Sequence, residues 1–107
     1  MKQLFLNRAT IKSFLKTRQR EKSIGLVILK EEIEKENMND PLVCALCQFV
    51  ATCDQILEAL QKLLDKSPEP KIFLDTYEVA ALKLLTTAIS TIKYRSAVDY
   101  NISLEIH

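Results

Sequence analysis

Three cysteines, Cys44, Cys47 and Cys53, lie close together and are the first candidates for chemistry. A Cys-x-x-Cys pair near a helix N-terminus could bind a metal or act as a redox pair, because the helix dipole stabilises thiolate. A tetrahedral zinc site needs four ligands, and the single histidine, His107, is the last residue of the sequence. The residues around the pair are apolar, so we interpret all three cysteines as packing residues, with Cys53 in the core. We therefore predict no metal site and no cofactor.

Histidine and glycine, which many catalytic and phosphate-binding sites need, each occur once, as His107 and Gly25. A serine or cysteine nucleophile is activated by a positioned imidazole, and a terminal histidine is poorly placed for that role. Phosphate-binding loops need several glycines so that backbone N–H groups can approach the anion. Asp54 and Glu58 are one helical turn apart, but neither comes with the histidine of a di-iron carboxylate site. We therefore expect that the protein is not an enzyme.

A row of basic residues near the N-terminus is the best candidate for a binding surface. Residues 1–22 carry seven basic side chains and one acidic side chain. The row and the residues beside it are Arg8, Lys12, Lys16, Arg18, Arg20 and Lys22. Such a row suits phosphate groups, an acidic protein or an anionic membrane surface, or it is a solvated face neutralised by the acidic run 31–36. All of these residues except Lys22 are our candidate partner-binding residues.

A length of 107 residues predicts a single domain over residues 1–107, which the patterns described below predict to be helical. Hydrophobic residues make up 48% of the chain and charged residues 27%, close to the average of globular proteins. Three clustered cysteines form no closed disulfide framework, which favours a reducing, cytoplasmic location. No uninterrupted apolar stretch reaches about 18 residues, so we expect no transmembrane segment.

The clearest predicted element is a helix that begins at Pro41 and ends near Lys66. Asp40 is expected to cap it, because a carboxylate accepts from the free N–H groups of the first turn. Its apolar residues are spaced four and three apart and form one seam: Leu42, Leu46, Phe49, Cys53, Ile56, Leu60 and Leu63. Prolines 68 and 70 forbid its continuation.

A second long helix is predicted after Asp75, which forms a capping box with Glu78. Its expected core face consists of Ala81, Leu84, Leu85, Ala88, Ile89 and Ile92. Because the linker 67–74 is short, we expect the two helices to form an antiparallel hairpin. A helix of about 25 residues is about 37 Å long, so the fold should be elongated.

The first forty residues are predicted as a further helical region with one break. Residues 10–22 form a basic amphipathic helix, and the register fails around Gly25, which we predict to be a hinge. Residues 24–29 fit either a helix, which we favour, or a short buried strand. Residues 4–6 and 102–106 have β-like character and could pair as short strands, with each other or across a dimer.

The predicted fold is therefore all-α: an elongated antiparallel helical hairpin plus an N-terminal helical region, in a three- to four-helix bundle. Between Pro41 and Ala51, Gln48 is the only conventional polar residue, so this stretch needs cover on every side. The N-terminal helix of a monomer or a second copy could provide it. We favour a homodimer whose interface includes Val43, Cys44, Cys47 and Val50.

Two functions remain. The leading prediction is a small non-enzymatic regulator, adaptor or inhibitor that binds another protein through helical surfaces and its basic N-terminal segment. The alternative is a nucleic-acid-binding accessory protein that uses the same basic helix.

Overall fold

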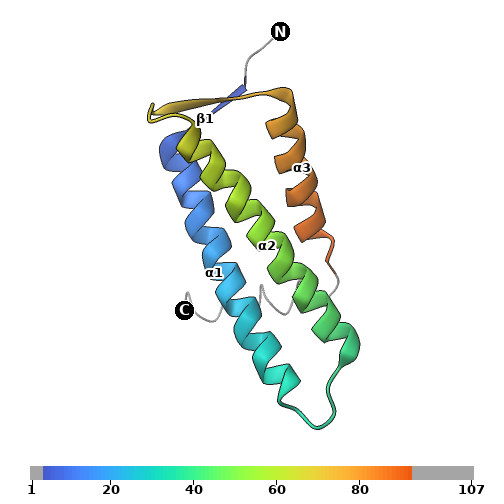
Figure 1. The fold of residues 1–107 in the computed structure, drawn as a ribbon. Coiled ribbons are helices and arrows are strands. Elements are labelled where there is room, and N and C mark those ends of the chain that lie inside the picture. Colours follow the sequence, from blue (N-terminus) through green and yellow to red (C-terminus); the bar gives the residue numbers. More distant parts are fainter. Residues whose placement is uncertain (1–3, 93–107) are drawn as a thin grey trace.

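The protein is mostly helical, as predicted. The computed structural model describes residues 4–92, which form five elements in chain order (Figure 1). They are β1 (Leu4–Asn7), α1 (Arg8–Ile33), α2 (Asp40–Lys66), β2 (Lys71–Leu74) and α3 (Thr76–Ser90). The molecule is elongated, with extents of 54 × 28 × 20 Å. Its length follows from α1 and α2, which lie side by side (Figure 1).

Helix α2 is the centre of the fold, because α1 packs along it on one side and α3 on another (Figure 1). It begins one residue later than its cap, Asn39, whose Oδ1 accepts a hydrogen bond from the Leu42 N–H at 3.1 Å. The cap predicted at Asp40 is therefore wrong by one residue. The predicted apolar seam is confirmed, with Leu42 half-buried and the other six residues buried. Its end at Lys66 is also as predicted.

Helix α1 runs without interruption through Gly25, so the predicted hinge at this glycine is wrong. The strand alternative for 24–29 is wrong as well, because these residues are helical. Gly25 is buried against α2, where an added Cβ would lie 3.1 Å from Cδ1 of Phe49 and 3.4 Å from Cγ2 of Val50. The missing side chain thus leaves room for the Phe49 ring at the contact between the two helices.

Strands β1 and β2 pair as an antiparallel two-stranded sheet across one end of the helices (Figure 1). Leu4 lies opposite Leu74, and Asn7 lies opposite Lys71. The strand predicted at 4–6 is confirmed, but its partner differs from the predicted one: it is β2, which falls within the stretch that was predicted as a linker. The other predicted strand, 102–106, lies outside the described residues.

Helix α3 begins with the predicted capping box: Asp75 Oδ1 accepts from the Glu78 N–H at 2.7 Å, and Glu78 Oε1 accepts from the Asp75 N–H at 2.9 Å. Within Thr76–Ser90 only Ile89 is fully buried. The residues that pack against the core beside it are half-buried: Val79, Leu82, Leu85 and Ile92. The predicted core face is therefore partly wrong, because Leu84 and Ala88 are exposed.

The turn between α1 and α2 is held by the carboxylate of Glu32, whose side chain is only 7% exposed. Its Oε2 accepts from Lys35 Nζ at 2.9 Å, and its Oε1 accepts from the Asn39 N–H at 2.9 Å. The hydrogen bond from Lys35, and after it the one from Asn39, hold the pKa of Glu32 below its ordinary value. The same contact raises the pKa of Lys35. Because Asn39 also caps α2, one carboxylate connects the end of α1 to the start of α2.

Candidate functional site: helix surfaces

Arg8, the first residue of the predicted basic row, forms hydrogen bonds within the fold. Its Nη1 donates to the carbonyl oxygens of Leu64 and Ser67, at 3.2 and 2.6 Å. Its backbone N–H donates to the Pro70 carbonyl at 2.7 Å. The last carbonyl groups of a helix lack partners and carry partial negative charge, so a guanidinium stabilises them. The Arg8 side chain therefore holds the C-terminus of α2 to the start of α1.

Two further cations of this region form ion pairs within the fold. Arg18 Nη1 lies 2.7 Å from Oε2 of Glu21, whose side chain is 6% exposed. A carboxylate removed from water needs such a partner, because an unpaired buried charge is strongly destabilising. Lys22 Nζ lies 2.6 Å from Oδ1 of Asp54, which links α1 to α2. Arg18 and Lys22 are therefore each neutralised by a carboxylate of the same chain.

Lys12, Lys16 and Arg20 are the exposed members of the predicted partner-binding set. They follow one another at four-residue intervals and so lie on one face of α1. Lys12 also borders a cavity of about 450 Å³, together with Arg8, Pro68 and Pro70. Three of the five predicted residues thus form an exposed basic face. The other two, Arg8 and Arg18, form contacts within the fold.

The three cysteines have two different environments. Cys53 is fully buried in the core, as predicted, whereas Cys44 and Cys47 are exposed on α2. The interpretation of this pair as packing residues therefore does not hold within a single chain. Residues 4–92 contain no group of histidine, cysteine, aspartate and glutamate side chains that could hold a metal ion.

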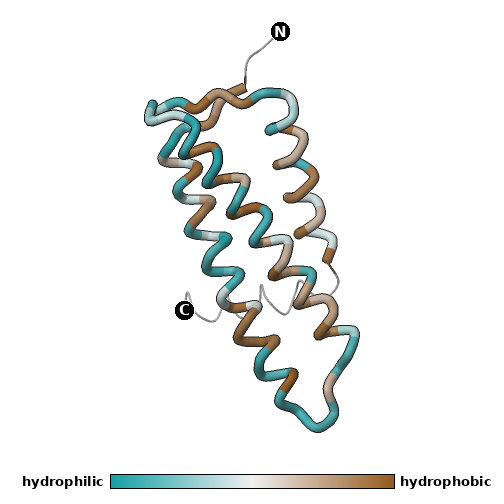
Figure 2. The backbone as a smooth tube through the Cα atoms, in the orientation of Figure 1, coloured by the Kyte–Doolittle hydropathy of each residue, from teal (hydrophilic) through white to brown (hydrophobic). Residues whose placement is uncertain are grey.

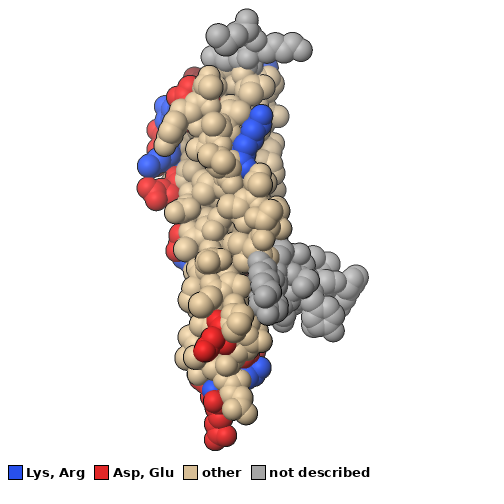
Figure 3. Space-filling model, turned by 90° about the vertical axis from the view of Figure 1, so that its right-hand side faces the viewer, with Lys and Arg blue, Asp and Glu red and all other residues tan. Residues whose placement is uncertain are grey.

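An almost uncharged surface extends over α3 and residues 42–53 of α2 (Figure 3). Among the exposed residues of 42–53 and 76–91, Lys83 is the only one that carries a charge. Helix α3 is apolar or weakly polar over most of its length, whereas the N-terminal part of α1 is largely hydrophilic (Figure 2). Tyr77 and Leu84 stand out on this surface, because 81% and 72% of their respective areas are exposed.

These exposed residues belong to a regular row that we call the α3 seam. It consists of Tyr77, Ala80, Leu84, Thr87 and Thr91, all of which are exposed. The spacing of three and four residues places the first four on one side of the helix, away from Ile89, and Thr91 directly follows the last helical residue. This row was not predicted, because the periodicity of the helix placed Leu84 on the core face. The sequence does contain a signal for this row: uncharged residues recur at intervals of three and four along a second side of the same helix.

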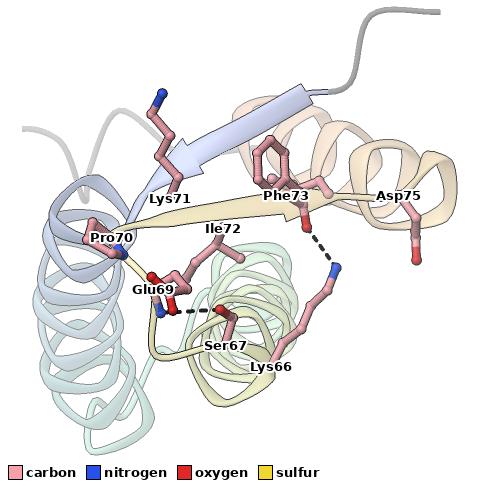
Figure 4. A pocket seen from close by; sticks show the side chains of 9 residues that line it. Lys66, Ser67, Glu69, Pro70, Lys71, Ile72, Phe73 and Asp75 are labelled. Atoms are coloured by element: carbon pink, nitrogen blue, oxygen red, sulfur yellow. Dashed lines mark hydrogen bonds between the residues drawn. The ribbon is translucent and has the colours of Figure 1, made fainter.

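A cavity of about 730 Å³ follows the outer edge of β2 (Figure 4). Lys66 Nζ closes part of this edge by donating to the Phe73 carbonyl oxygen and to Glu78 Oε1, both at 2.7 Å. A lysine at an unpaired strand edge protects it against pairing with another chain. The hydroxyl in this cavity, Ser67 Oγ, accepts from the Glu69 N–H at 3.2 Å and so stabilises the turn. The cavity lining contains no histidine that could activate this hydroxyl as a nucleophile.

Helix α2 is long and apolar enough, by length and composition alone, to cross a membrane, and it is the only such helix within residues 4–92. The central helix of a globular core meets the same criterion, and α2 supplies eight buried residues to this core.

Comparison of the chain with protein-family models, with curated proteins and with solved structures finds no match. The surfaces described above are therefore the basis on which its function is argued.

Proposed function

We propose that this protein is a small non-enzymatic regulator, adaptor or inhibitor that acts by binding another protein through its helical surfaces. The observation that supports this proposal is the exposure of Tyr77 and Leu84 on a face with almost no charge. Centres of protein interfaces are rich in aromatic residues and poor in charged ones. Burying one large apolar side chain contributes about 2 kcal/mol. The α3 seam thus has the composition of a docking surface.

The packing of the helices supports the same proposal. Helices α1 and α3 both contact α2, and we propose that they form an open three-helix bundle. The outer side of α3, away from the buried Ile89, remains open for a helix of another protein. A partner that supplies a helix there would cover Tyr77 and Leu84. The three cysteines form no disulfide with one another, which favours a reducing, cytoplasmic setting.

The basic face of α1 supports a nucleic-acid-binding function less well. Affinity for nucleic acid rises with the number of phosphates that cations neutralise. Arg8 and Arg18 already bind carbonyl and carboxylate groups of the protein, so they contribute little to the binding of phosphates. We therefore assign this face a supporting role, in attracting an acidic region of the protein partner.

Comparative affinity capture tests the proposed function. The baits are the wild-type protein, Leu84→Glu on the α3 seam, Thr86→Glu as a matched control, and a double variant with Lys12 and Lys16 changed to glutamate. Thr86 is exposed on α3 but lies off the seam. We expect a stoichiometric protein to be captured by the wild type and by Thr86→Glu and to be lost from Leu84→Glu. The double variant should capture it with reduced yield.

Two results would overturn the proposed function. The first is the capture of no stoichiometric protein by the wild type. The second is a bound nucleic acid whose affinity falls steeply with salt, is lost in the double lysine variant and is unchanged in Leu84→Glu.

A further inference from the structure

The α3 seam, together with the exposed Ala88 beside it, has a property that bears on what covers it: residues at equal distances before and after Leu84 complement each other in size. Tyr77 and Thr91 are each seven residues from Leu84, and Ala80 and Ala88 are each four residues from it. All five residues are exposed. A surface that pairs with its own copy through a two-fold axis must be complementary to itself, because each residue then meets the residue related to it by symmetry.

We propose that the α3 seam binds a second copy of this chain, with the two α3 helices antiparallel and crossing at Leu84. This inference rests on the proposed function, since it takes the uncharged face to be an interaction surface, for which the second copy and the protein partner then compete. In this arrangement a residue n positions before Leu84 lies opposite the residue n positions after it in the other copy. Tyr77 then faces Thr91, and Ala80 faces Ala88.

The sizes of the side chains favour this antiparallel pairing. The bulky ring of Tyr77 meets the small side chain of Thr91 at each end of the contact. At the centre, Leu84 of one copy contacts Leu84 of the other. Ala80 and Ala88 flank this contact, and their small side chains allow the two helices to approach closely. A parallel pairing would instead place Tyr77 against Tyr77 and would align the two helix dipoles unfavourably.

The charges of the surface also favour a second copy as the occupant. A charged patch repels its own copy, so a surface that pairs with itself must be neutral or must alternate in sign. The seam carries no charged residue, and Lys83 lies on its flank. Across an antiparallel pair, Lys83 is level with Leu85 of the other copy, so it does not directly oppose a like charge.

The small area of the seam limits the expected strength of the dimer. Helix α3 has 15 residues and is therefore about 22 Å long. A strip of this length and about 10 Å in width has a much smaller area than the surface of about 800 Å² that each partner buries in a standard interface. We therefore expect a reversible dimer with a dissociation constant on the order of tens of micromolar.

Sedimentation equilibrium tests the association. Between about 5 and about 500 µM, a range that brackets the expected constant, the average mass of the wild type should rise from 12.3 kDa towards twice that value. Leu84→Glu places two like charges together at the two-fold axis, and it should remain at 12.3 kDa with an unchanged circular dichroism spectrum. Thr86→Glu should dimerise like the wild type. A wild type that is monomeric throughout, or a Leu84→Glu variant that dimerises equally well, would overturn the inference.

Disulfide cross-linking tests the antiparallel register. The background carries Cys44→Ser and Cys47→Ser, which removes the exposed thiols and keeps the buried Cys53. A mixture of Tyr77→Cys and Thr91→Cys chains should form a cross-linked heterodimer on mild oxidation, whereas Tyr77→Cys alone should not cross-link. Cross-linking of Tyr77→Cys to itself would show a parallel pairing and overturn the inference.

The failure of this inference can be distinguished from the failure of the proposed function. A monomeric wild type that captures a protein and loses it on Leu84→Glu overturns only the pairing of copies. A dimer that captures no other protein supports the pairing and removes the role as a regulator.

Discussion

The ring of Phe49 on α2 occupies the space that a side chain at Gly25 on α1 would fill. Phe49 is 1% exposed, and its Cδ1 would lie 3.1 Å from a Cβ at Gly25. Carbon atoms at optimal separation are about 3.5–4.0 Å apart, so this contact leaves no room for a methyl group without movement. The one glycine of the chain is therefore used for the packing of two helices.

Replacement of Gly25 by alanine tests this interpretation through the sign of its effect. At an unconstrained helical position, the change would stabilise the protein by about 1 kcal/mol. Here the overpacking of a buried contact costs about 1–3 kcal/mol, so we expect a net loss of about 1 kcal/mol in the free energy of unfolding. Urea denaturation measures the difference. A stabilised Gly25→Ala protein would contradict the close contact.

Phe49→Leu provides the matched background for this measurement. With the ring removed, the methyl group of alanine has space, and only the gain in helix propensity remains. Gly25→Ala should therefore stabilise Phe49→Leu by up to about 1 kcal/mol while it destabilises the wild type. Equal effects in both backgrounds would show that the two residues are not coupled.

Gly25 also shows where prediction from the sequence fails. Glycine disfavours helix by about 1 kcal/mol relative to alanine, and this local preference suggested a hinge. The contact with Phe49, which is distant in the sequence, outweighs that preference. Helix α2, by contrast, was predictable almost to the residue, because its seam, its cap region and the prolines after it are all local signals.

The candidate site was predictable only in part for the same reason. The basic residues were evident from their spacing, but the contacts of Arg8 with Leu64 and Ser67 join segments more than fifty residues apart. Strand β2 depends likewise on pairing with β1, at the other end of the described chain. Leu84 was placed on the wrong side of α3, because two apolar rows share this helix and only packing on α2 distinguishes them.

Arg8 and Lys12 should respond differently to substitution by alanine. Hydrogen bonds that involve a charged group contribute about 1.5–3 kcal/mol, so loss of the contacts of Arg8 with the end of α2 should lower the free energy of unfolding by about 2 kcal/mol. Lys12 is exposed, and its replacement should change stability by no more than about 0.5 kcal/mol. Chemical denaturation of both variants measures these values. Equal stability of the two variants would contradict the capping role of Arg8.

The turn at Glu32 should make stability depend on pH in the acidic range. The pKa of Glu32 is lowered from 4.5 in the folded protein, so its ionised form stabilises the fold above pH 4.5. This contribution is lost as the pH falls below 4.5 and through the lowered pKa of the folded state. Glu32→Gln should therefore be less stable than the wild type at pH 7, and the difference should shrink in acid.

Glu34→Gln is the control for this pH experiment. Glu34 is exposed and lies two residues from Glu32, so its change should leave both the stability at pH 7 and the acid profile close to those of the wild type. Denaturant titrations at a series of pH values measure all three proteins. A stability difference between Glu32→Gln and the wild type that stays constant with pH would show that the carboxylate charge is not what holds the turn.

Thiol labelling can distinguish the two dimer interfaces, because the chain carries its own probes. In the folded monomer Cys44 and Cys47 should react rapidly with an aromatic disulfide reagent, while Cys53, at 0% exposure, should react only on unfolding. If copies pair through the α3 seam, the rates at the exposed pair should not change between dilute and concentrated protein. If they pair through the surface of Val43, Cys44, Cys47 and Val50, both rates should fall in proportion to the dimer fraction measured by sedimentation. Leu84→Glu completes the comparison, since it should abolish the rise in mass while leaving the labelling rates unchanged.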